Sequence, residues 1–573
     1  MNTAVIQTSS GVLRFAAPER VIVAMQPDEV TPALREIENI VNQRRQYAVG
    51  FMAYEAAAAY GLSVHPPWPD LPLLCFGLYA HAEQVAAYPT TPAICTVGPW
   101  RSCLELDDYA VGVQRIRRYL ADGHSYQVNY TFGLETEFAG EPQAFFTDLA
   151  AAQQGRYAAC IDMGRFVICS ASPELFFRLE GEQLTAKPMK GTARRGRTLA
   201  EDESQRVNLR QSDKNRAENL MITDMVRNDL GRVARIGSVA AAPLFEVECY
   251  PTVLQMTSTV TARTSATVTE ILQHLFPSAS ITGAPKVRTM AIIRELESQP
   301  RGVYTGTVGM IAPDRQAQFN VAIRSVLFDR ERQQAFYGVG SGIVWDSDAD
   351  DEYQECLLKA QVLTRKSPSF QLLESLLWEP GVGYFLLDAH LRRLANSAAY
   401  FDFSLDRIAV EMRLAALATT LTAATKVRLL VSPDGVFELE TTALAQGAPA
   451  RPVRVGWARQ PVDSSVCWLY HKTTERQIYQ AARATRPDCD EVLLWNERGE
   501  LTEASTANVV LELGGARVTP PVACGLLAGT FRSWLLAHGH LQERILTKTD
   551  LYAAQRIYLI NAVRRWQEAL LII

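Results

Sequence analysis

A polar, proline-broken stretch at Arg365–Ser369 is the feature that most constrains what this chain can fold into. It separates two long regions of mixed apolar and polar sequence, and a new apolar run, FQLLESLL at 370–377, follows it at once. Single hydrophobic cores stop growing beyond about 250–300 residues. A chain of 573 residues therefore needs more than one core. We predict two domains, residues 1–365 and 366–573, and we find no internal repeat that relates them.

The composition is that of an ordinary globular protein, with 48% hydrophobic and 21% charged residues. A formal net charge of -5 gives no long-range attraction to nucleic acid or to anionic lipid. No run of about 18 apolar residues marks a membrane span, and the polar start at residues 1–10 lacks the apolar core of a signal peptide. Ten scattered cysteines without a C-x-x-C pair argue against zinc and against a disulfide framework. We expect a cytoplasmic protein that binds neither nucleic acid nor membrane.

Hydrophobic periodicity predicts alternating helices and strands in the first region, and so a mixed α/β fold. A strand that begins at Leu184 runs into a turn, PMKGT at 188–192, where Pro188 and Gly191 bend the chain and hold Lys190 between them. A lone turn lysine is usually a solvated surface residue. The pattern also predicts helices at 107–121, 205–233 and 287–296, and strands at 126–131, 303–311 and 319–328.

Charged residues of the first region are spaced as if to form one site. Glu352, Glu355 and Lys359 project from one face of an expected helix, and a glycine-rich strand precedes that helix. Carboxylates without His or Cys, here joined by Glu218, suit Mg²⁺. Arg324 and Lys359 beside glycine amides suit a bound carboxylate. Acidic residues at a helix start also compensate the helix dipole without binding anything. The residues alone predict a small dicarboxylate held partly through magnesium.

Four ordered motifs resemble the chorismate-utilising enzymes, a family that includes anthranilate, isochorismate, salicylate and aminodeoxychorismate synthases. The motifs are AENLMITDMVRNDL at 217–230, ITGAPK at 281–286, GSGI at 340–343 and EYQE at 352–355, and the resemblance covers residues 10–363. It implies a large antiparallel α/β sandwich, with Mg²⁺ held by Glu218 and Glu355 and assisted by Glu352. It also implies that chorismate contacts the following residues: Gly191, Thr192, Tyr304, Arg324, Gly340, Ser341, Gly342 and Lys359.

Two positions distinguish members of this family. Relatives that form isochorismate or salicylate place a water-activating lysine where this chain has Gln127, which disfavours water as the nucleophile. Anthranilate synthases resemble PIAGT where this chain has PMKGT, and a lysine at the position of Lys190 is typical of aminodeoxychorismate synthase component I. The resemblance implies a mechanism in which Lys190 attacks C2 of the ring while the C4 hydroxyl leaves with a proton from Glu174. Ammonia then attacks C4 and expels the lysine, which gives 4-amino-4-deoxychorismate.

No segment of the sequence reads as a glutamine-hydrolysing Cys-His-Glu domain. Cys103 and Cys160 lack a nucleophile-elbow context and are more typical of packing residues. By resemblance to the family, a separate glutamine amidotransferase subunit, component II, is expected as the partner that supplies ammonia.

The second region resembles the fold-type IV pyridoxal-phosphate enzymes, which include branched-chain and D-amino-acid aminotransferases and aminodeoxychorismate lyase. The motifs are LDAHLRRL at 387–394, LTEASTAN at 501–508 and LAGTFR at 527–532. The resemblance implies a unit of two subdomains that forms a homodimer. Lys472, by itself most simply a surface lysine, would bond covalently to the cofactor, and Glu503 would meet its pyridinium nitrogen. Arg393 and the amides of Gly529 and Thr530 would bind its phosphate.

Together the two resemblances imply a bifunctional enzyme that makes 4-aminobenzoate for folate. The first half would form aminodeoxychorismate and the second would eliminate pyruvate from it. Two alternatives remain open at this point. The chain could join an anthranilate-synthase-like domain to a branched-chain or D-amino-acid transaminase, or its second half could be a catalytically silent docking or dimerisation module.

Overall fold

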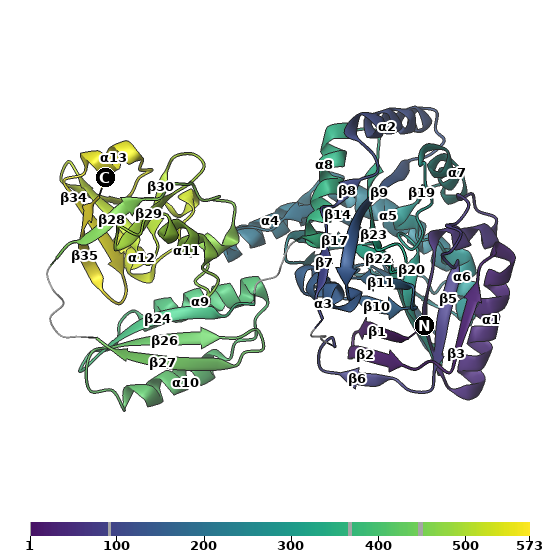
Figure 1. The fold of residues 1–573 in the computed structure, drawn as a ribbon, viewed down its shortest axis with the longest axis horizontal. Coiled ribbons are helices and arrows are strands. Elements are labelled where there is room, and N and C mark those ends of the chain that lie inside the picture. The colour runs from purple at the N-terminus through teal and green to yellow at the C-terminus, as the bar shows by residue number, and fades with distance from the viewer. Residues whose placement is uncertain (1, 90–92, 365–368, 445–450, 573) are drawn as a thin grey trace. The chain divides into compact units, whose positions relative to one another are not determined.

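The computed structural model describes residues 2–89, 93–364, 369–444 and 451–572. The chain forms two compact units (Figure 1). The first unit comprises residues 1–194 and 206–367, and the second comprises residues 195–205 and 368–573. Residues 195–205, which lie between the two sequence segments of the first unit, thus belong to the second unit. Residues 365–368 of the expected boundary lie outside the described residues.

The first unit is built on two large sheets in which every strand pairing is antiparallel. The eleven-stranded sheet has the order β19-β9-β23-β22-β11-β10-β1-β2-β6, with β7 and β8 paired to β9. Its strands are β1 (Thr3–Thr8), β2 (Gly11–Ala16), β6 (Glu83–Val85), β7 (Cys95–Val97), β8 (Arg101–Ser102), β9 (Gln127–Gly140), β10 (Ala159–Asp162), β11 (Phe166–Ser170), β19 (Gly283–Ala284), β22 (Ser325–Asp329) and β23 (Gln334–Ile343).

The nine-stranded sheet has the order β15-β18-β13-β12-β21-β20-β4-β5-β3. Its strands are β3 (Arg20–Ala24), β4 (Tyr47–Met52), β5 (Leu74–Tyr79), β12 (Leu175–Glu180), β13 (Gln183–Lys187), β15 (Ala240–Ala241), β18 (Val260–Arg263), β20 (Thr307–Ala312) and β21 (Gln316–Val321). Residues from both sheets, among them Ile161, Ile168, Phe51 and Met310, share one apolar cluster, so the sheets pack face to face. This confirms the predicted antiparallel α/β sandwich.

Helices cover both outer faces of this sandwich. Because successive residues of a strand point to opposite faces, Val167 and Cys169 of β11 pack against helices while Ile168 packs against the other sheet. The helices on the nine-stranded sheet are α1 (Pro27–Arg44), α5 (Asp213–Gly231) and α6 (Val268–Leu275). Those on the eleven-stranded sheet are α2 (Leu106–Ala121), α3 (Pro142–Gln153), α7 (Lys286–Leu296) and α8 (Ala349–Ala360).

The predicted turn around Lys190 is wrong, because Lys190 lies on a strand. β13 ends at Lys187, and β14 (Met189–Arg194) joins β16 (Glu246–Cys249) and β17 (Val253–Thr257) in a separate three-stranded sheet. Pro188 has no N–H with which to continue the β13 ladder, so the chain changes sheets there. Gly191 has a φ of 94° within a register shift of the β14–β17 pairing, which makes the strand bulge directly after Lys190.

Three other predicted elements differ from the structure. The helix expected at 205–233 is two helices, α4 (Leu199–Gln211) and α5, because the hydroxyl of Ser212 caps a new N-terminus by accepting from the amide of Asn215. The strand expected at 319–328 is divided into β21 and β22 at Arg324, whose φ is 53°. The strand expected at 303–311 begins only at Thr307.

The second unit contains two sheets, in agreement with the predicted pair of subdomains. A four-stranded sheet, β25-β24-β26-β27, packs against α9 (Leu387–Phe401) and α10 (Arg407–Ala418) (Figure 1). Its strands are β24 (Leu372–Glu379), β25 (Gly383–Tyr384), β26 (Thr425–Val431) and β27 (Phe437–Ala443).

An eight-stranded sheet with three parallel pairings, β30-β29-β28-β35-β34-β31-β32-β33, carries α11 (Gln477–Ala484), α12 (Thr530–Ala537) and α13 (Lys548–Ala553). Its strands are β28 (Val453–Trp457), β29 (Glu491–Trp495), β30 (Leu501–Ala504), β31 (Asn508–Leu513), β32 (Ala516–Thr519), β33 (Gln542–Glu543), β34 (Arg556–Asn561) and β35 (Arg565–Leu571). Within the described part of the chain, no helix combines the length and the apolar character that a membrane span requires.

Candidate active sites

Lys190 is partly buried where the three-stranded sheet meets β23. Asn219 of α5 donates to the Lys190 carbonyl oxygen at 3.1 Å, which holds the strand in place. A Cβ atom placed on Gly342 of β23 would lie 2.5 Å from Lys190 Nζ and 2.6 Å from Gln127 Nε2. Glycine at 342 therefore leaves the space in which the two side chains, from β14 and β9, converge.

The surroundings of Lys190 make its amine easier to deprotonate. Burial lowers the pKa of Lys190, and the charge of Lys359 lowers it further. The carboxylates of Glu218, Glu355 and Glu352 oppose this shift, in that order. All three predicted acidic residues thus act electrostatically on the same lysine, and the result is an amine that is both less basic than usual and surrounded by anions.

Glu174, the predicted proton donor, is buried beside this lysine. Only 4% of its surface is exposed, and burial raises the pKa of its carboxyl to about 7. A hydrogen bond with Ser280 and the charge of Lys190 pull that pKa downward, so Glu174 and Lys190 interact directly in electrostatic terms. A carboxyl with a pKa near 7 can hold a proton and release it at neutral pH, as a general acid must.

Charged residues of α8 are fixed against the glycine-rich strand β23. Lys359 Nζ is 2.7 Å from Glu355 Oε1 and donates to the Gly340 carbonyl at 2.9 Å. Burial raises the pKa of Glu355, but Lys359 and Lys190 together bring it below its ordinary value. Arg324 donates to the Lys359 carbonyl oxygen, which joins the two predicted carboxylate-binding cations.

The structure does not assemble a magnesium site from these residues. Among the described residues, no three His, Cys, Asp or Glu side chains lie close enough together to hold a metal ion. Glu355 is paired with Lys359, and Glu352 accepts hydrogen bonds from Ser341 and from Ser347, the latter at 2.7 Å. Magnesium binding therefore stays a prediction of the family resemblance.

Two other predicted substrate-binding residues are Thr192, on β14, and Tyr304, which packs against Gly338 of β23. Thr192 is exposed, and its hydroxyl donates to Gln255 at 3.0 Å. Tyr304 lines a separate cavity of about 230 Å³, whose lining contains none of Lys190, Glu218 or Glu355.

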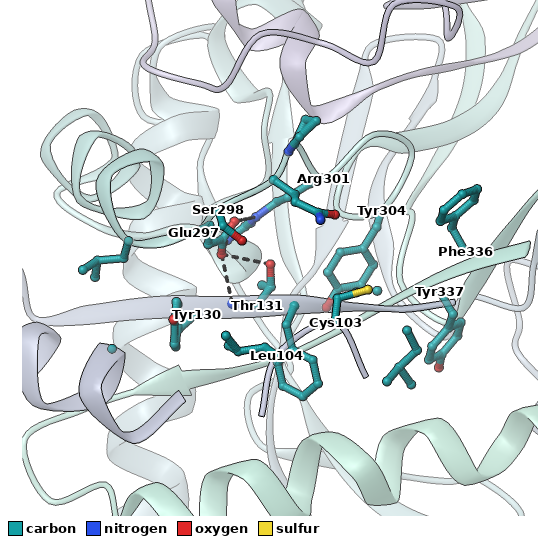
Figure 2. A pocket seen from close by; sticks show the side chains of 18 of the residues that line it. Cys103, Leu104, Tyr130, Thr131, Glu297, Ser298, Arg301, Tyr304, Phe336 and Tyr337 are labelled. Atoms are coloured by element: carbon teal, nitrogen blue, oxygen red, sulfur yellow. Dashed lines mark hydrogen bonds and ion pairs between the residues drawn. The ribbon is translucent and has the colours of Figure 1, made fainter. Parts of the chain in front are cut away.

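Figure 2 shows this separate cavity, with Glu297 between Thr131 and Arg301. Arg301 Nη2 is 2.7 Å from Glu297 Oε1, and the same oxygen accepts from the Thr131 amide at 2.9 Å. This buried pair supports the wall from which Tyr304 projects. The contact of Tyr304 with a substrate remains a prediction.

Two residues that support the first site were not predicted to do so. Asn219 stands beside Glu218 in the recognised helix motif, and Ser280 directly precedes ITGAPK. Because each lies in or next to a recognised motif, its position in the sequence could have identified it as a supporting residue. Gln127 was singled out, but its state was not foreseen: it is 2% exposed, and its Oε1 has no hydrogen-bond partner among the described residues.

In the second unit, one cavity of about 910 Å³ brings together all five residues predicted to bind pyridoxal phosphate. They are Arg393, Lys472, Glu503, Gly529 and Thr530. Burial lowers the pKa of the Lys472 amine to about 8, with the charge of Arg393 as the next cause. Its backbone carbonyl accepts from the Leu373 amide at 2.9 Å, which ties the lysine to β24.

The carboxyl group of Glu503 is buried in one wall of this cavity. Glu503 is 4% exposed, and burial raises the pKa of its carboxyl to about 7. The hydroxyl of Tyr479 donates to its Oε1 at 2.7 Å, and the Asn508 amide donates to Oε2 at 3.2 Å. These two bonds orient the carboxyl for a ring nitrogen. Tyr479, on α11, belongs to no recognised motif, so no sequence signal pointed to it.

Arg393 and the start of α12 form the other end of the cavity. Arg393 pairs with buried Glu374 at 2.7 Å, and His390 Nδ1 lies 2.7 Å from the same carboxylate. Burial alone would raise the pKa of Glu374, but Arg393 and His390 hold it at about 2. Gly529 precedes α12 and offers no side-chain cap, so the first amides of the helix are open to an anion.

The lysine, the fixed acid, the open helix start and the cavity volume match the chemical needs of pyridoxal phosphate: an amine, a partner for the ring nitrogen and a phosphate seat. The residues present therefore fit the cofactor.

Comparison with known proteins decides the family. The family model described as chorismate binding enzyme matches residues 5–365, more than half of the chain. The chain belongs to the chorismate-binding enzymes. Residues 371–572 match the model described as amino-transferase class IV. The two parts of this chain are thus a chorismate-binding domain and a class IV aminotransferase domain.

Its relatives include aminodeoxychorismate synthases. The chain is 40% identical over 280 residues to "Aminodeoxychorismate synthase" of Streptomyces griseus, covering 48% of this chain and 38% of the relative. It is 36% identical over 272 residues to "Aminodeoxychorismate synthase component 1" of Bacillus subtilis (strain 168), covering 47% of this chain and 57% of the relative. The matched part is therefore less than two thirds of either relative.

One solved structure shares the fold of the first domain. It is anthranilate synthase component I from Streptococcus pneumoniae TIGR4, with a TM-score of 0.51, 22% identity and coverage of 63% of this chain and 90% of that chain. This similarity concerns the fold alone.

Proposed function

We propose that this chain makes 4-aminobenzoate, a folate precursor, from chorismate and ammonia in two steps. The chorismate-binding domain converts chorismate to 4-amino-4-deoxychorismate, and the class IV domain eliminates pyruvate from that product. The proposal is supported by the names of the relatives and by the chemistry of the two lysine sites.

In the first step, the Lys190 amine attacks C2 of the ring, and the C4 hydroxyl leaves as water with the proton of Glu174. Ammonia then bonds to C4, and the C2–nitrogen bond breaks to release Lys190. The sum is chorismate and ammonia to aminodeoxychorismate and water, with no oxidant or reductant. The covalent step divides one difficult displacement into two easier ones.

The observation that carries this proposal is the opposed tuning of Lys190 and Glu174. The lysine has a lowered pKa, which favours the free amine, and the buried acid beside it has a pKa of about 7. A nucleophile that must be neutral and an acid that must keep its proton need these opposite shifts.

In the second unit, pyridoxal phosphate would be held by Lys472, Glu503, Arg393 and the amides of Gly529 and Thr530. When bound, it would supply an electron-accepting ring. Lys472, with a pKa of about 8, removes and returns a proton near neutral pH. Glu503, as a carboxylate, would meet the ring nitrogen and favour its protonated form, and Tyr479 keeps Glu503 in place.

The charge of the second cavity favours a substrate with more than one carboxylate. Lys426 and Arg428 of β26 and Arg564 also line it. Burial lowers the pKa of Lys426, and the charges of Arg428 and Arg564 lower it further, so the three cations act on one another. Glu440 pairs with Arg428 at 2.5 Å and neutralises only one of them. Aminodeoxychorismate carries two carboxylates, whereas a branched-chain amino acid carries one.

Ammonia would come from a glutamine amidotransferase partner, because the relative from Bacillus subtilis is named as a component 1. The proposed oligomer is a homodimer formed through the class IV domain. Magnesium binding would require Glu355 to exchange Lys359 for the metal, which titration calorimetry with Mg²⁺ and chorismate would detect.

The deciding experiment supplies the purified chain with chorismate, Mg²⁺, pyridoxal phosphate and ammonium. We expect 4-aminobenzoate and pyruvate in equal amounts, and a chorismate-derived mass on the Lys190 peptide after acid quenching. Undiminished turnover by Lys190→Ala would rule out the role of that amine. Formation of 2-aminobenzoate would instead support the anthranilate-synthase alternative for the first domain, and amino-group transfer to a 2-oxo acid would support a transaminase in the second.

A further inference from the structure

The second unit contains a segment, Arg195–Gln205, that follows directly on β14 in the sequence. It includes the first residues of α4 and lies within the region matched by the chorismate-binding family. Class IV sequence similarity begins only at residue 371, so nothing in that similarity accounts for the segment.

The segment has a fixed conformation of its own. Asp202 accepts from Arg195 Nε at 2.6 Å and from the Gly196 amide at 2.9 Å. A Cβ atom on Gly196 would lie 2.1 Å from the Asp202 amide nitrogen, so only glycine fits there. These bonds close a turn immediately before α4.

Tyr400 of α9 docks on this turn. Its hydroxyl donates to the Gly196 carbonyl at 2.7 Å, and Arg195 Nη2 donates back to the Tyr400 carbonyl at 2.9 Å. The Arg195 guanidinium also lies 4.4 Å from the centre of the Tyr400 ring. The ring is 6% exposed, so these bonds are largely shielded from water.

The two residues before Lys472 both bind Arg197. The Arg197 Nη1 atom donates to the Tyr470 hydroxyl at 2.9 Å, and that hydroxyl donates to the Ser464 carbonyl at 2.7 Å. His471 Nε2 lies 3.1 Å from the Arg197 carbonyl oxygen, and the His471 ring stacks on Tyr400 with centroids 4.3 Å apart.

The protonation of His471 follows from these contacts. Burial lowers its pKa to about 4, so the ring is neutral at pH 7. A carbonyl oxygen only accepts, so Nε2 carries the hydrogen and donates to Arg197. Nδ1 then accepts from the Ser397 hydroxyl at 2.9 Å. Both ring nitrogens are satisfied only while the Arg197 carbonyl is present, and His471 is only 6% exposed.

We propose that Arg195–Gln205, through Arg197, positions the loop that carries Lys472. The backbone of that loop is tied to β24 on one side, and on the other Tyr470 and His471 are tied to Arg197. Arg197 is a positioning residue, since it acts on the amine through its two neighbours. The importance of this for catalysis rests on the proposed function of Lys472 as the lysine that bonds to the cofactor.

The test measures amide hydrogen exchange in the peptide 466–474 of the full chain, without added cofactor. In Arg197→Ala we expect exchange to rise about 5-fold, the effect of losing one partly buried hydrogen bond. Arg544→Ala is the matched control. Arg197 makes a 2.7 Å ion pair with Glu201, and Arg544 makes a 2.7 Å ion pair with Asp550 in the same unit. Equal exchange in Arg197→Ala and in the unchanged chain would overturn the proposal.

A second measurement links the loop to the amine. In the full chain, the apparent pKa for cofactor binding should rise by about half a unit to one unit in Arg197→Ala, because water then reaches Lys472. Tyr470→Phe should shift it in the same direction, and the double variant should add little to either. Fully additive shifts would overturn the link. If the unchanged chain binds no pyridoxal phosphate, the proposed function fails, while the exchange experiment still decides whether Arg197 holds the loop.

Discussion

The two lysine sites lower the pKa of an amine by burial in both cases, but in opposite electrostatic surroundings. Lys190 sits among the carboxylates of Glu218, Glu352 and Glu355, which oppose the shift. Lys472 faces a cavity lined by arginines, and Arg393 adds to the shift. The first site therefore sets burial and Lys359 against three carboxylates around one amine. The second gives its amine a pKa of about 8, so that it can release a proton near neutral pH, and adds an excess of positive charge for anionic ligands.

The largest expected effect tests whether the two lysines serve separate steps. Lys190→Ala should reduce aminodeoxychorismate formation by about 10³-fold or more, as for the loss of a nucleophile. The same variant should still release pyruvate from supplied aminodeoxychorismate. Lys472→Ala should do the reverse and accumulate the intermediate. Chromatography of both products measures this, with exposed Lys548→Ala as the control. Loss of both activities in either variant would contradict the division of labour.

Glu174→Gln should reduce the first step by about 10²–10³-fold, because a general acid is lost. The unchanged chain should lose first-step activity as pH rises above about 7, where Glu174 gives up its proton. That falling limb should be absent in the variant. Glu180→Gln is the control, because Glu180 lies at the exposed end of β12, the strand that begins directly after Glu174. A pH profile of chorismate consumption with the limb unchanged would remove Glu174 from the acid role.

Glu374→Gln tests the charge pairing that organises the second site. It leaves Arg393 without its buried partner and should destabilise the second unit by about 3 kcal/mol. The folded pKa of Glu374 is about 2, below its unfolded value, so its contribution is present above pH 4.5 and is lost as pH falls toward 2. Denaturant unfolding at pH 6 and pH 3 measures both. Glu379 lies on β24, the strand that also carries Glu374, and forms a partly exposed ion pair with Arg565. Glu379→Gln removes that pair and should change the stability little. A pH-independent difference between the variant and the unchanged chain would contradict this account.

Tyr479→Phe should have the smallest effect, about a 10-fold weaker binding of pyridoxal phosphate. The lost hydrogen bond lowers the pKa of Glu503, so without it that pKa should rise above about 7 and the acid should be more often neutral. A pH titration of the visible absorbance of the bound cofactor reports this shift. Tyr552→Phe removes an exposed hydroxyl and serves as the control. An unshifted titration would show that Asn508 alone suffices to fix Glu503.

The sequence predicted the residues of the two sites better than the backbone conformation around them or the remote side chains that support them. Two recognised motifs contain Arg393 and Glu503, and the resemblance that they support implied the role of Lys472. One cavity contains all three residues. The turn predicted at Lys190 failed because a proline that ends a strand and a proline that begins a turn look alike until the partner strand, β17, is known. Tyr479 and Ser280 were missed because their partners, Glu503 and Glu174, are remote in the chain.

The docking of Tyr400 and His471 on Arg195–Gln205 sets a limit on how this chain can be divided. A gene cut at the inter-domain linker would yield a second protein that contains every class IV motif. In it, Tyr400 and His471 would lack the carbonyl oxygens that accept from them, and Tyr470 would lack the donor Arg197. Such a fragment would need either a replacement for eleven residues (195 to 205) or those residues supplied as a separate peptide. Restoration of the fragment by that peptide would show that the fold of the second unit requires these residues, whether or not they are joined to it covalently.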